Sequence, residues 1–253
     1  YGLRMGFTGA SSSDPGHLNL LADSGPVTLS TRSGSINLQN SNTSISLGST
    51  AGSAVTTSTS TLRLVTNNLS AAGAIGFNTS GALNIEPFGS SFTADLNTSV
   101  LRYSNDLSSL TLGKSTNTAN ITLGSATSIA GPIMVYGGNI TVNGNLNTSA
   151  GGAAGDVLLK ASADISIAAS RTITTSGGDV VLWANSDGQD TGGGIFAYSG
   201  VNISTDGGHL WLGGGSGNAS WNGLTVGDGY AVSGTTVTAP LVSGGSNSTF
   251  GTP

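Results

Sequence analysis

The chain has 253 residues, of which only 8% are charged and 41 are glycine. Its formal net charge is −5 and its seven Lys and Arg residues are scattered singly, which argues against nucleic acid as a partner. The absence of cysteine excludes a disulfide scaffold and is more typical of a secreted bacterial protein than of a small secreted eukaryotic domain. No apolar run approaches the roughly 20 residues that a transmembrane helix needs.

The chain begins at Tyr1 and shows no signal-peptide pattern, so we expect a processed mature chain or a piece of a longer one. Residues 1–22 contain no repeat, which predicts an N-terminal cap or leader segment. Residues 23–240 carry a repeating strand pattern. Residues 241–253 are rich in Gly and Ser, which predicts a linker-like tail or an incomplete coil.

Short strands with alternating apolar residues dominate the chain, and each ends at a Gly, Ser, Asn or Asp break. Strict alternation predicts one buried and one exposed face, and no segment of useful length has helical periodicity. The alternating pairs are Val27-x-Leu29, Ile36-x-Leu38, Ile45-x-Leu47, Leu110-x-Leu112, Ile121-x-Leu123, Ile133-x-Val135, Ile140-x-Val142, Val157-x-Leu159, Ile165-x-Ile167, Val180-x-Leu182, Leu210-x-Leu212 and Leu224-x-Val226.

The spacing of these strands predicts the architecture. Val157 and Val180 are 23 residues apart, and strands at Ile165 and Ile173 lie between them. A period in the range of roughly 20–50 residues indicates a solenoid or array. We therefore predict an all-β fold, a parallel β-helix (β-solenoid) with about 23 residues per three-strand coil. The same interval separates three further pairs: Leu110 and Ile133, Val180 and Ile203, and Ile203 and Val226.

An antiparallel sandwich or barrel is the alternative fold, because it also joins short strands by tight turns. Asn143-Gly144 and Asn222-Gly223 are good hairpin signals. Most breaks are instead Gly-Gly or Ser-Gly, and a sandwich gives no reason for a 23-residue period. We therefore favour the solenoid.

The clearest repeats lie between Leu101 and Gly215, in the segments LRYSNDLSSLTLG, ATSIAGPIMVYGGNITV, GDVLLKASADISIAASRTITTSGGDVVLWANSDG and GGHLWLGGG. These segments resemble the β-strand repeats of filamentous-haemagglutinin-like bacterial surface proteins, closely over a little under half of the chain. The resemblance implies a β-helical shaft of a large exported adhesin or an extracellular fibre. We do not find the signature of that family's amino-terminal secretion domain, so the resemblance implies shaft rather than export module. It implies no catalytic residues.

Parallel β-helices also include enzymes that cleave polysaccharides, which need several carboxylates on one face. Asp156 and Asp179 precede equivalent strands and could form one column, but Asx-type turns also explain them. We therefore predict no enzymatic activity and no catalytic residues. A carbohydrate-binding or carbohydrate-active β-helix is the alternative function. An ice-binding solenoid would need regular Thr-x-Thr rows, and the pair at Thr172 and Thr174 does not recur at the 23-residue period.

Asn185, Asp187 and Asp190 supply oxygen ligands in one short loop, which makes them a candidate calcium site. The loop lacks a following bidentate Glu, so a polar turn is the favoured interpretation, and no other cofactor is predicted. His17 and His209 lie far apart in a chain without Cys, so we expect no zinc site.

Five aromatic residues form a candidate interaction surface. Strand alternation places Trp183 and Trp211 on the outside of the coil, together with Phe196 and Tyr198. Tyr198 and Trp221 are 23 residues apart, so we expect them to stack in neighbouring coils. Exposed aromatic side chains often mark an interaction site. We expect this surface to bind another copy of the chain or a host-cell or matrix glycan, unless a local loop covers it.

The predicted function is structural. The repeat, the low charge and the family resemblance favour an extracellular or cell-surface protein that forms a stiff fibre or adhesin shaft. Unpaired strand edges at the ends of a solenoid would promote self-association into an oligomer or filament.

Overall fold

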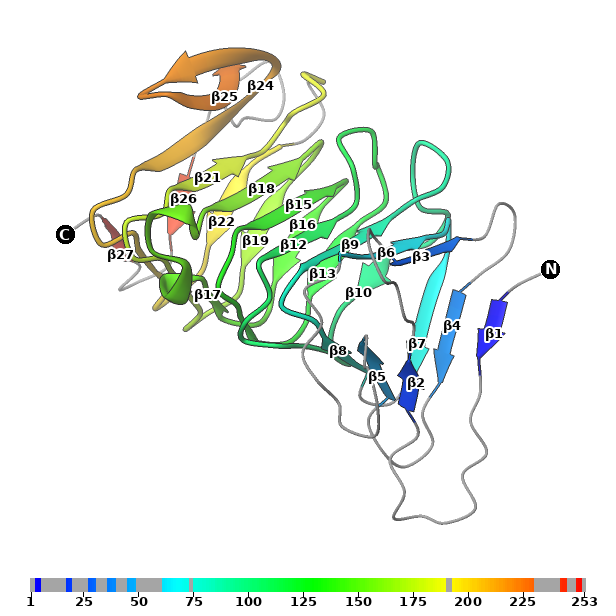
Figure 1. The fold of residues 1–253 in the computed structure, drawn as a ribbon. Helices are drawn as coiled ribbons and strands as arrows, with labels where there is room; N and C mark the ends of the chain where they lie inside the picture. The colour runs from blue at the N-terminus through cyan, green and yellow to red at the C-terminus, as the bar shows by residue number, and fades with distance from the viewer. Residues whose placement is uncertain are drawn as a thin grey trace.

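The computed structural model describes residues 3–5, 17–19, 27–30, 36–39, 45–48, 61–72, 75–189, 193–229, 242–244 and 249–251. Within these ranges the regular structure is almost entirely β-strand, and the one helix is the short 3₁₀ segment η1 (Ser149–Ala154). The strands lie side by side along one axis, so that the chain advances from one end of the molecule to the other (Figure 1).

Each coil contributes one strand to each of three faces. The first face is a nine-stranded sheet. Its coil strands are β3 (Val27–Ser30), β6 (Leu62–Val65), β9 (Ala82–Glu86), β12 (Ser109–Leu112), β15 (Ile133–Gly137), β18 (Val157–Ala161), β21 (Val180–Trp183) and the start of β24 (Leu210–Trp221).

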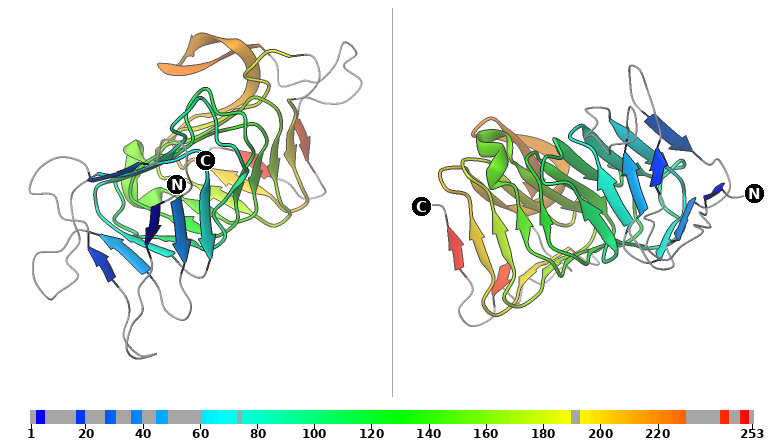
Figure 2. Two further views of the ribbon diagram at one scale, coloured as in Figure 1. Left: turned by 90° about the vertical axis from the view of Figure 1, so that its right-hand side faces the viewer. Right: turned by 60° about the horizontal axis from the view of Figure 1, so that its bottom comes forward.

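The second and third faces complete each coil, as the turned views in Figure 2 show. The second face comprises β10 (Leu96–Asn97), β13 (Ile121–Leu123), β16 (Ile140–Val142), β19 (Ile165–Ile167), β22 (Ile195–Ala197) and β26 (Val242–Gly244). The third face comprises β14 (Thr127–Ser128), β17 (Leu146–Asn147), β20 (Thr172–Thr174), β23 (Asn202–Ser204) and β27 (Thr249–Gly251).

Two shorter sheets belong to the N-terminal coils. One contains β1 (Leu3–Met5), β4 (Ile36–Gln39) and β7 (Leu69–Ala72). The other contains β2 (His17–Asn19), β5 (Ile45–Gly48), β8 (Ile75–Asn78) and β11 (Leu101–Tyr103). Strands from residues 1–22 and 241–253 are therefore members of the parallel sheets: β1 and β2 pair with β4 and β5, and β26 and β27 pair with β22 and β23.

The predicted parallel β-solenoid is confirmed. Every strand pair in the described ranges is parallel except β24 with β25 (Leu224–Gly229), so the antiparallel sandwich is wrong. Inward-facing residues of successive coils stack in register, for example Leu110, Ile133 and Val157 on the first face. These side chains are buried in one continuous core. Each fully buried Leu, Ile or Val contributes roughly 1.5–3 kcal/mol, so the core grows with every added coil.

The predicted 23-residue interval holds only in the middle of the chain. Val157 pairs with Val180 as expected, but Val180 pairs with Leu210 and not with Ile203. Ile203 instead stacks on Ile173 in the third face, and Val226 belongs to an antiparallel hairpin. The coil lengthens from 23 to 30 residues here because the segment joining β21 to β22 is longer. Loop-closure entropy rises slowly with length, so the stack tolerates the insertion.

Polar columns hold the corners of the coils. Asp95, Asn120, Asn139 and Asp164 each precede a strand of the second face, and each side-chain oxygen accepts a backbone N–H from the next coil at 2.8–3.1 Å. These Asp and Asn residues therefore bond one coil to the next.

At another corner the buried hydroxyls of Thr148, Thr175 and Thr205 donate to the carbonyls of Gly155, Gly178 and Gly208. Each of these Thr residues follows a strand of the third face. The recurring Thr-Gly contact closes the turn that leads into the first face.

Candidate functional site

A hairpin departs from the coil near the C-terminal end of the described solenoid. Strand β24 continues beyond the first face and returns as β25, so the pair projects from the stack (Figure 1). The turn is Asn222-Gly223, and both residues have positive φ, at 47° and 82°. Positive φ at both positions is the requirement of a type I′ turn, which Asn-Gly satisfies best. This hairpin signal is therefore confirmed.

The hairpin covers the outer side of the first face. Trp183 points away from the coil interior, as alternation predicts, but it is only 2% exposed. It packs with Val181 and Val226 in a second, small apolar cluster that also contacts Trp211. The Trp183 and Trp211 rings meet edge to face at 6.2 Å, and the Trp183 indole N–H donates to the carbonyl of Gly215 at 2.8 Å. The expected exposure of Trp183 is therefore wrong, because the hairpin covers it.

Lys160 borders this cluster. Its Nζ lies 3.3 Å from the centroid of the Trp183 ring, within cation–π distance. Desolvation by the surrounding apolar side chains lowers the pKa of Lys160 from its ordinary value. The outer side of the first face therefore carries an apolar cluster that the hairpin covers and that the Lys160 ammonium borders.

The other candidate aromatics lie in separate places. Phe196 is half-buried on the second face and leans over Gly194, where a Cβ would lie 2.7 Å from its ring. Tyr198, two residues further along the chain, is 52% exposed. Trp221 is 38% exposed in the hairpin, with its ring 5.5 Å from that of His209. The predicted stacking of Tyr198 on Trp221 in neighbouring coils is wrong, because Trp221 pairs with Leu224 in the hairpin.

Asp156 and Asp179 form the predicted column. The Asp179 N–H donates to Asp156 Oδ1 at 2.8 Å, and the His209 N–H donates to Asp179 Oδ1 at 2.7 Å. The His209 ring Nδ1 is 2.9 Å from the same oxygen. The carboxylates bond the next coil and not their own turn, so they have the same role as the column on the second face.

The candidate calcium loop contains turn contacts. The carbonyl of Asn185 accepts the N–H groups of Gly188 and Gly215, and Asp187 Oδ1 accepts the Gln189 N–H at 3.1 Å. Asp190 lies outside the described residues. In the part of the chain that the structure describes, no three His, Cys, Asp or Glu residues gather closely enough to hold a metal ion.

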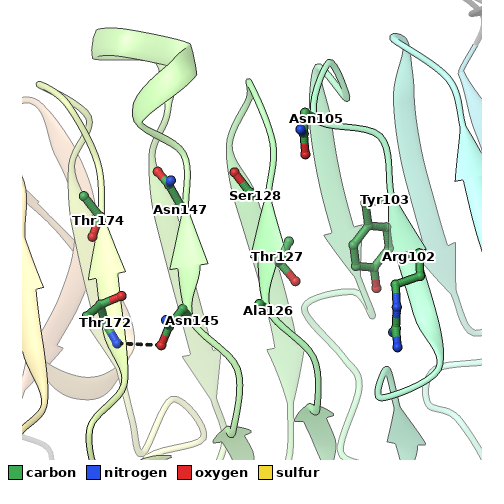
Figure 3. Close-up of a pocket in the computed structure, with 10 residues that line it drawn as sticks. All are labelled: Arg102, Tyr103, Asn105, Ala126, Thr127, Ser128, Asn145, Asn147, Thr172 and Thr174. Carbon is green, nitrogen blue, oxygen red and sulfur yellow. Dashed lines mark hydrogen bonds between the residues drawn. The ribbon is translucent and has the colours of Figure 1, made fainter.

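A shallow hollow of about 340 Å³ lies on the third face and was not predicted (Figure 3). It forms where β11 ends one sheet and β14 begins the next, so that the hydrogen-bonded ladder is interrupted. The only sequence signal for it is the pair Thr172 and Thr174, which by itself does not indicate a site. The hollow is lined by Arg102, Tyr103, Asn105, Ala126, Thr127, Ser128, Asn145, Asn147, Thr172 and Thr174.

Comparisons with protein-family models, curated proteins and solved structures give no match for this chain. The resemblance of its repeats to filamentous-haemagglutinin-like proteins therefore stays a prediction from the sequence. Among the residues with described positions, no helix is long and apolar enough to cross a membrane.

Proposed function

We propose that this protein is a structural, non-enzymatic component of an extracellular or cell-surface assembly, in which its β-solenoid serves as the stiff shaft of a fibre or adhesin. The observation that carries the proposal is the parallel ladder of the first face, which runs without interruption from β3 to β24. Each coil bonds only its neighbours, so the molecule lengthens along one axis without needing a thicker core. Such a rod separates its two ends and presents long side faces.

The polar residues support a structural role. Four Asp side chains of the described coils, Asp95, Asp156, Asp164 and Asp179, accept backbone N–H groups from the next coil. Carboxylates engaged in this way stiffen the stack rather than line a reaction site. The low charge of the chain also keeps electrostatic repulsion between stacked coils small.

Electron microscopy of the purified chain tests the proposal. We expect short rods, or unbranched filaments if the ends of the solenoid pair with one another, and a protease-resistant core that spans residues 82–212. Round particles, or rapid cleavage within the coils β12 to β21, would contradict a shaft. Sedimentation at several protein concentrations distinguishes a subunit that polymerises from a rod that stays single.

A further inference from the structure

The hollow on the third face has a distinctive composition. One end is formed by Arg102 and Tyr103 of β11, which lie side by side in Figure 3. The remainder is formed by Asn105 and by residues in or immediately before β14, β17 and β20. Its lining includes one guanidinium, several amides and hydroxyls, and no carboxylate. The volume of about 340 Å³ lies at the lower end of the range for small-ligand sites.

Two rows of polar side chains cross the hollow parallel to the axis of the solenoid. The register places Ser128, Asn147 and Thr174 in one row, with Asn145 and Thr172 in the other. Successive members of a row are separated by the inter-strand distance of about 4.8 Å. An extended ligand lying across the strands would therefore meet a polar group at every coil.

The amides of these rows are oriented as donors. Asn145 Oδ1 accepts the Thr172 N–H at 3.1 Å, and Asn147 Oδ1 accepts the N–H and hydroxyl of Ser149. Since both amide oxygens are occupied, the NH₂ groups are left as the free ends of these side chains. No hydrogen bond from either NH₂ group occurs within the described residues. The surface therefore offers donors to a ligand that is rich in acceptors.

Arg102 adds a positive charge that the protein itself holds in place. Its Nη1 donates to the carbonyls of Ser99 and Leu101, each at 2.8 Å, which fixes the guanidinium. The other nitrogens stay available for a carboxylate.

Tyr103 closes one end of the hollow from the core side. Its ring stacks on that of Phe77 with the centroids 6.0 Å apart, and its hydroxyl is buried near the side chain of Thr98. Burial raises the pKa of Tyr103, against smaller opposing effects of the nearby Thr98 hydroxyl and the Arg102 guanidinium. The register pairs Tyr103 with the inward-facing Phe77, so the ring borders the hollow from the core side and its hydroxyl lies below the surface.

We propose that this hollow binds a carboxylated oligosaccharide, with Arg102 pairing a carboxylate and the amides of Asn145 and Asn147 donating to ring and hydroxyl oxygens. The proposal rests on the proposed function in one respect, because an extracellular shaft would meet such polymers. A neutral glycan would satisfy the amides and hydroxyls but would leave the guanidinium without a counter-charge. The donor excess and the single cation therefore favour an acidic saccharide.

Isothermal titration calorimetry of the full chain with tetragalacturonate, and with cellotetraose as the neutral counterpart, tests this assignment. We expect binding of the acidic oligomer and much weaker binding of the neutral one. Arg102→Gln should lower the affinity for tetragalacturonate by about tenfold, as expected for one charge-assisted hydrogen bond. Lys114→Gln, which removes a charge elsewhere, should leave the affinity unchanged.

Asn145→Asp is the sharper variant. It keeps the oxygen that accepts the Thr172 N–H but replaces the donating NH₂ by a second carboxylate oxygen. We expect tetragalacturonate binding to fall by at least about tenfold while the melting temperature is retained. Asn97→Asp is the matched control, because Asn97 is exposed on the second face and its amide oxygen likewise accepts a backbone N–H.

Tyr103→Phe tests whether the buried side of the hollow takes part in binding. The Tyr103 hydroxyl has no exposed surface, so this variant should leave the affinity for tetragalacturonate unchanged. Equal affinity for both oligomers, an equal loss in Asn97→Asp, or no binding by the wild-type chain would overturn the proposal. Each of those results leaves the proposed shaft intact, because microscopy tests for rods independently. Binding of tetragalacturonate by a protein that forms no rods would instead contradict the proposed shaft and support the proposed saccharide site.

Discussion

The regular coils and the C-terminal hairpin use similar apolar strands in different ways. In the coils from β12 to β21, each inward side chain packs on its equivalent in the next coil, and the core is continuous. In the hairpin, Val226 packs back over the outer side of the first face and forms a separate small cluster with Trp183. Apolar residues on the outer side of a solenoid therefore indicate a local cover as readily as a partner.

The two Asn-Gly signals show the same difference. Asn222-Gly223 has positive φ at both residues and reverses the chain in an antiparallel hairpin. Asn143-Gly144 instead turns a corner between β16 and β17, with both N–H groups donating to the carbonyl of Leu123 in the coil before. An Asn-Gly pair therefore need not form a hairpin turn where a neighbouring coil supplies a backbone carbonyl as hydrogen-bond acceptor.

The largest expected effect comes from breaking the continuous core. Leu159→Ala should lower the free energy of unfolding by about 3–4 kcal/mol, because Leu159 is fully buried and its neighbours in adjacent coils cannot close the cavity. Chemical unfolding measures the loss. Thr111→Ala, at an outward half-buried position of the same face, should change stability little. Equal losses in the two variants would show that the core is not continuous.

Disrupting the small apolar cluster under the hairpin should lower the free energy of unfolding somewhat less. Trp183→Ala removes the contact with Trp211 and the hydrogen bond to Gly215, and we expect a loss of about 3 kcal/mol. Limited proteolysis should then cut the hairpin before it cuts the coils. Trp221→Ala, at an exposed position, serves as the control. Unchanged protease resistance of the hairpin in Trp183→Ala would show that Trp183 does not anchor it.

A smaller effect tests the corner glycine of the coils. A Cβ on Gly144 would lie 2.1 Å from the carbonyl oxygen of Ser125, which is backbone and cannot rotate away. Gly144→Ala should therefore lower the free energy of unfolding by about 2 kcal/mol through displacement of the neighbouring coil. Chemical unfolding against wild type measures the loss, and a neutral result would mean that the coils are packed less closely at this corner.

The hairpin glycine gives the matched comparison. Gly223 has a φ of 82°, but a methyl group at its Cα would point into open space, so Gly223→Ala meets backbone strain without a clash. We expect a loss of about 1 kcal/mol. If Gly223→Ala lowers the free energy of unfolding more than Gly144→Ala does, then turn strain costs more stability than a clash between coils, contrary to this prediction.

The smallest effect is expected at Lys160. Lys160→Met keeps the aliphatic contact with Trp183 and removes both the cation–π contact and the desolvation of the ammonium, so stability should change by no more than about 0.5 kcal/mol. Because the pKa of Lys160 is lowered on folding, its contribution to wild-type stability should rise as the pH approaches 10.5, and the variant should lack this rise. Unfolding measured across that pH range provides the check. A loss well above 1 kcal/mol at neutral pH would mean that the cation–π contact dominates.

Local patterns explain which parts of the fold were predictable. Alternation at Val180 and Leu182 gave the correct inward face, and Asp156 and Asp179 gave a correct column. The outward direction of Trp183 was also correct, and β24 and β25 supply the local cover that was the alternative to exposure. The hollow was missed because its residues come from strands that are separate in sequence, such as Asn145 and Thr172.

The sequence by itself determined the strands and their inward faces, because side-chain alternation is a property of the local backbone. Only the tertiary structure decided which coils pair, as when Val180 meets Leu210 and not Ile203. Which strands pair depends on the number of residues in the turns between them, and the strand pattern does not fix that number. Likewise, only the tertiary structure places Trp183 under the hairpin and Arg102 at the hollow.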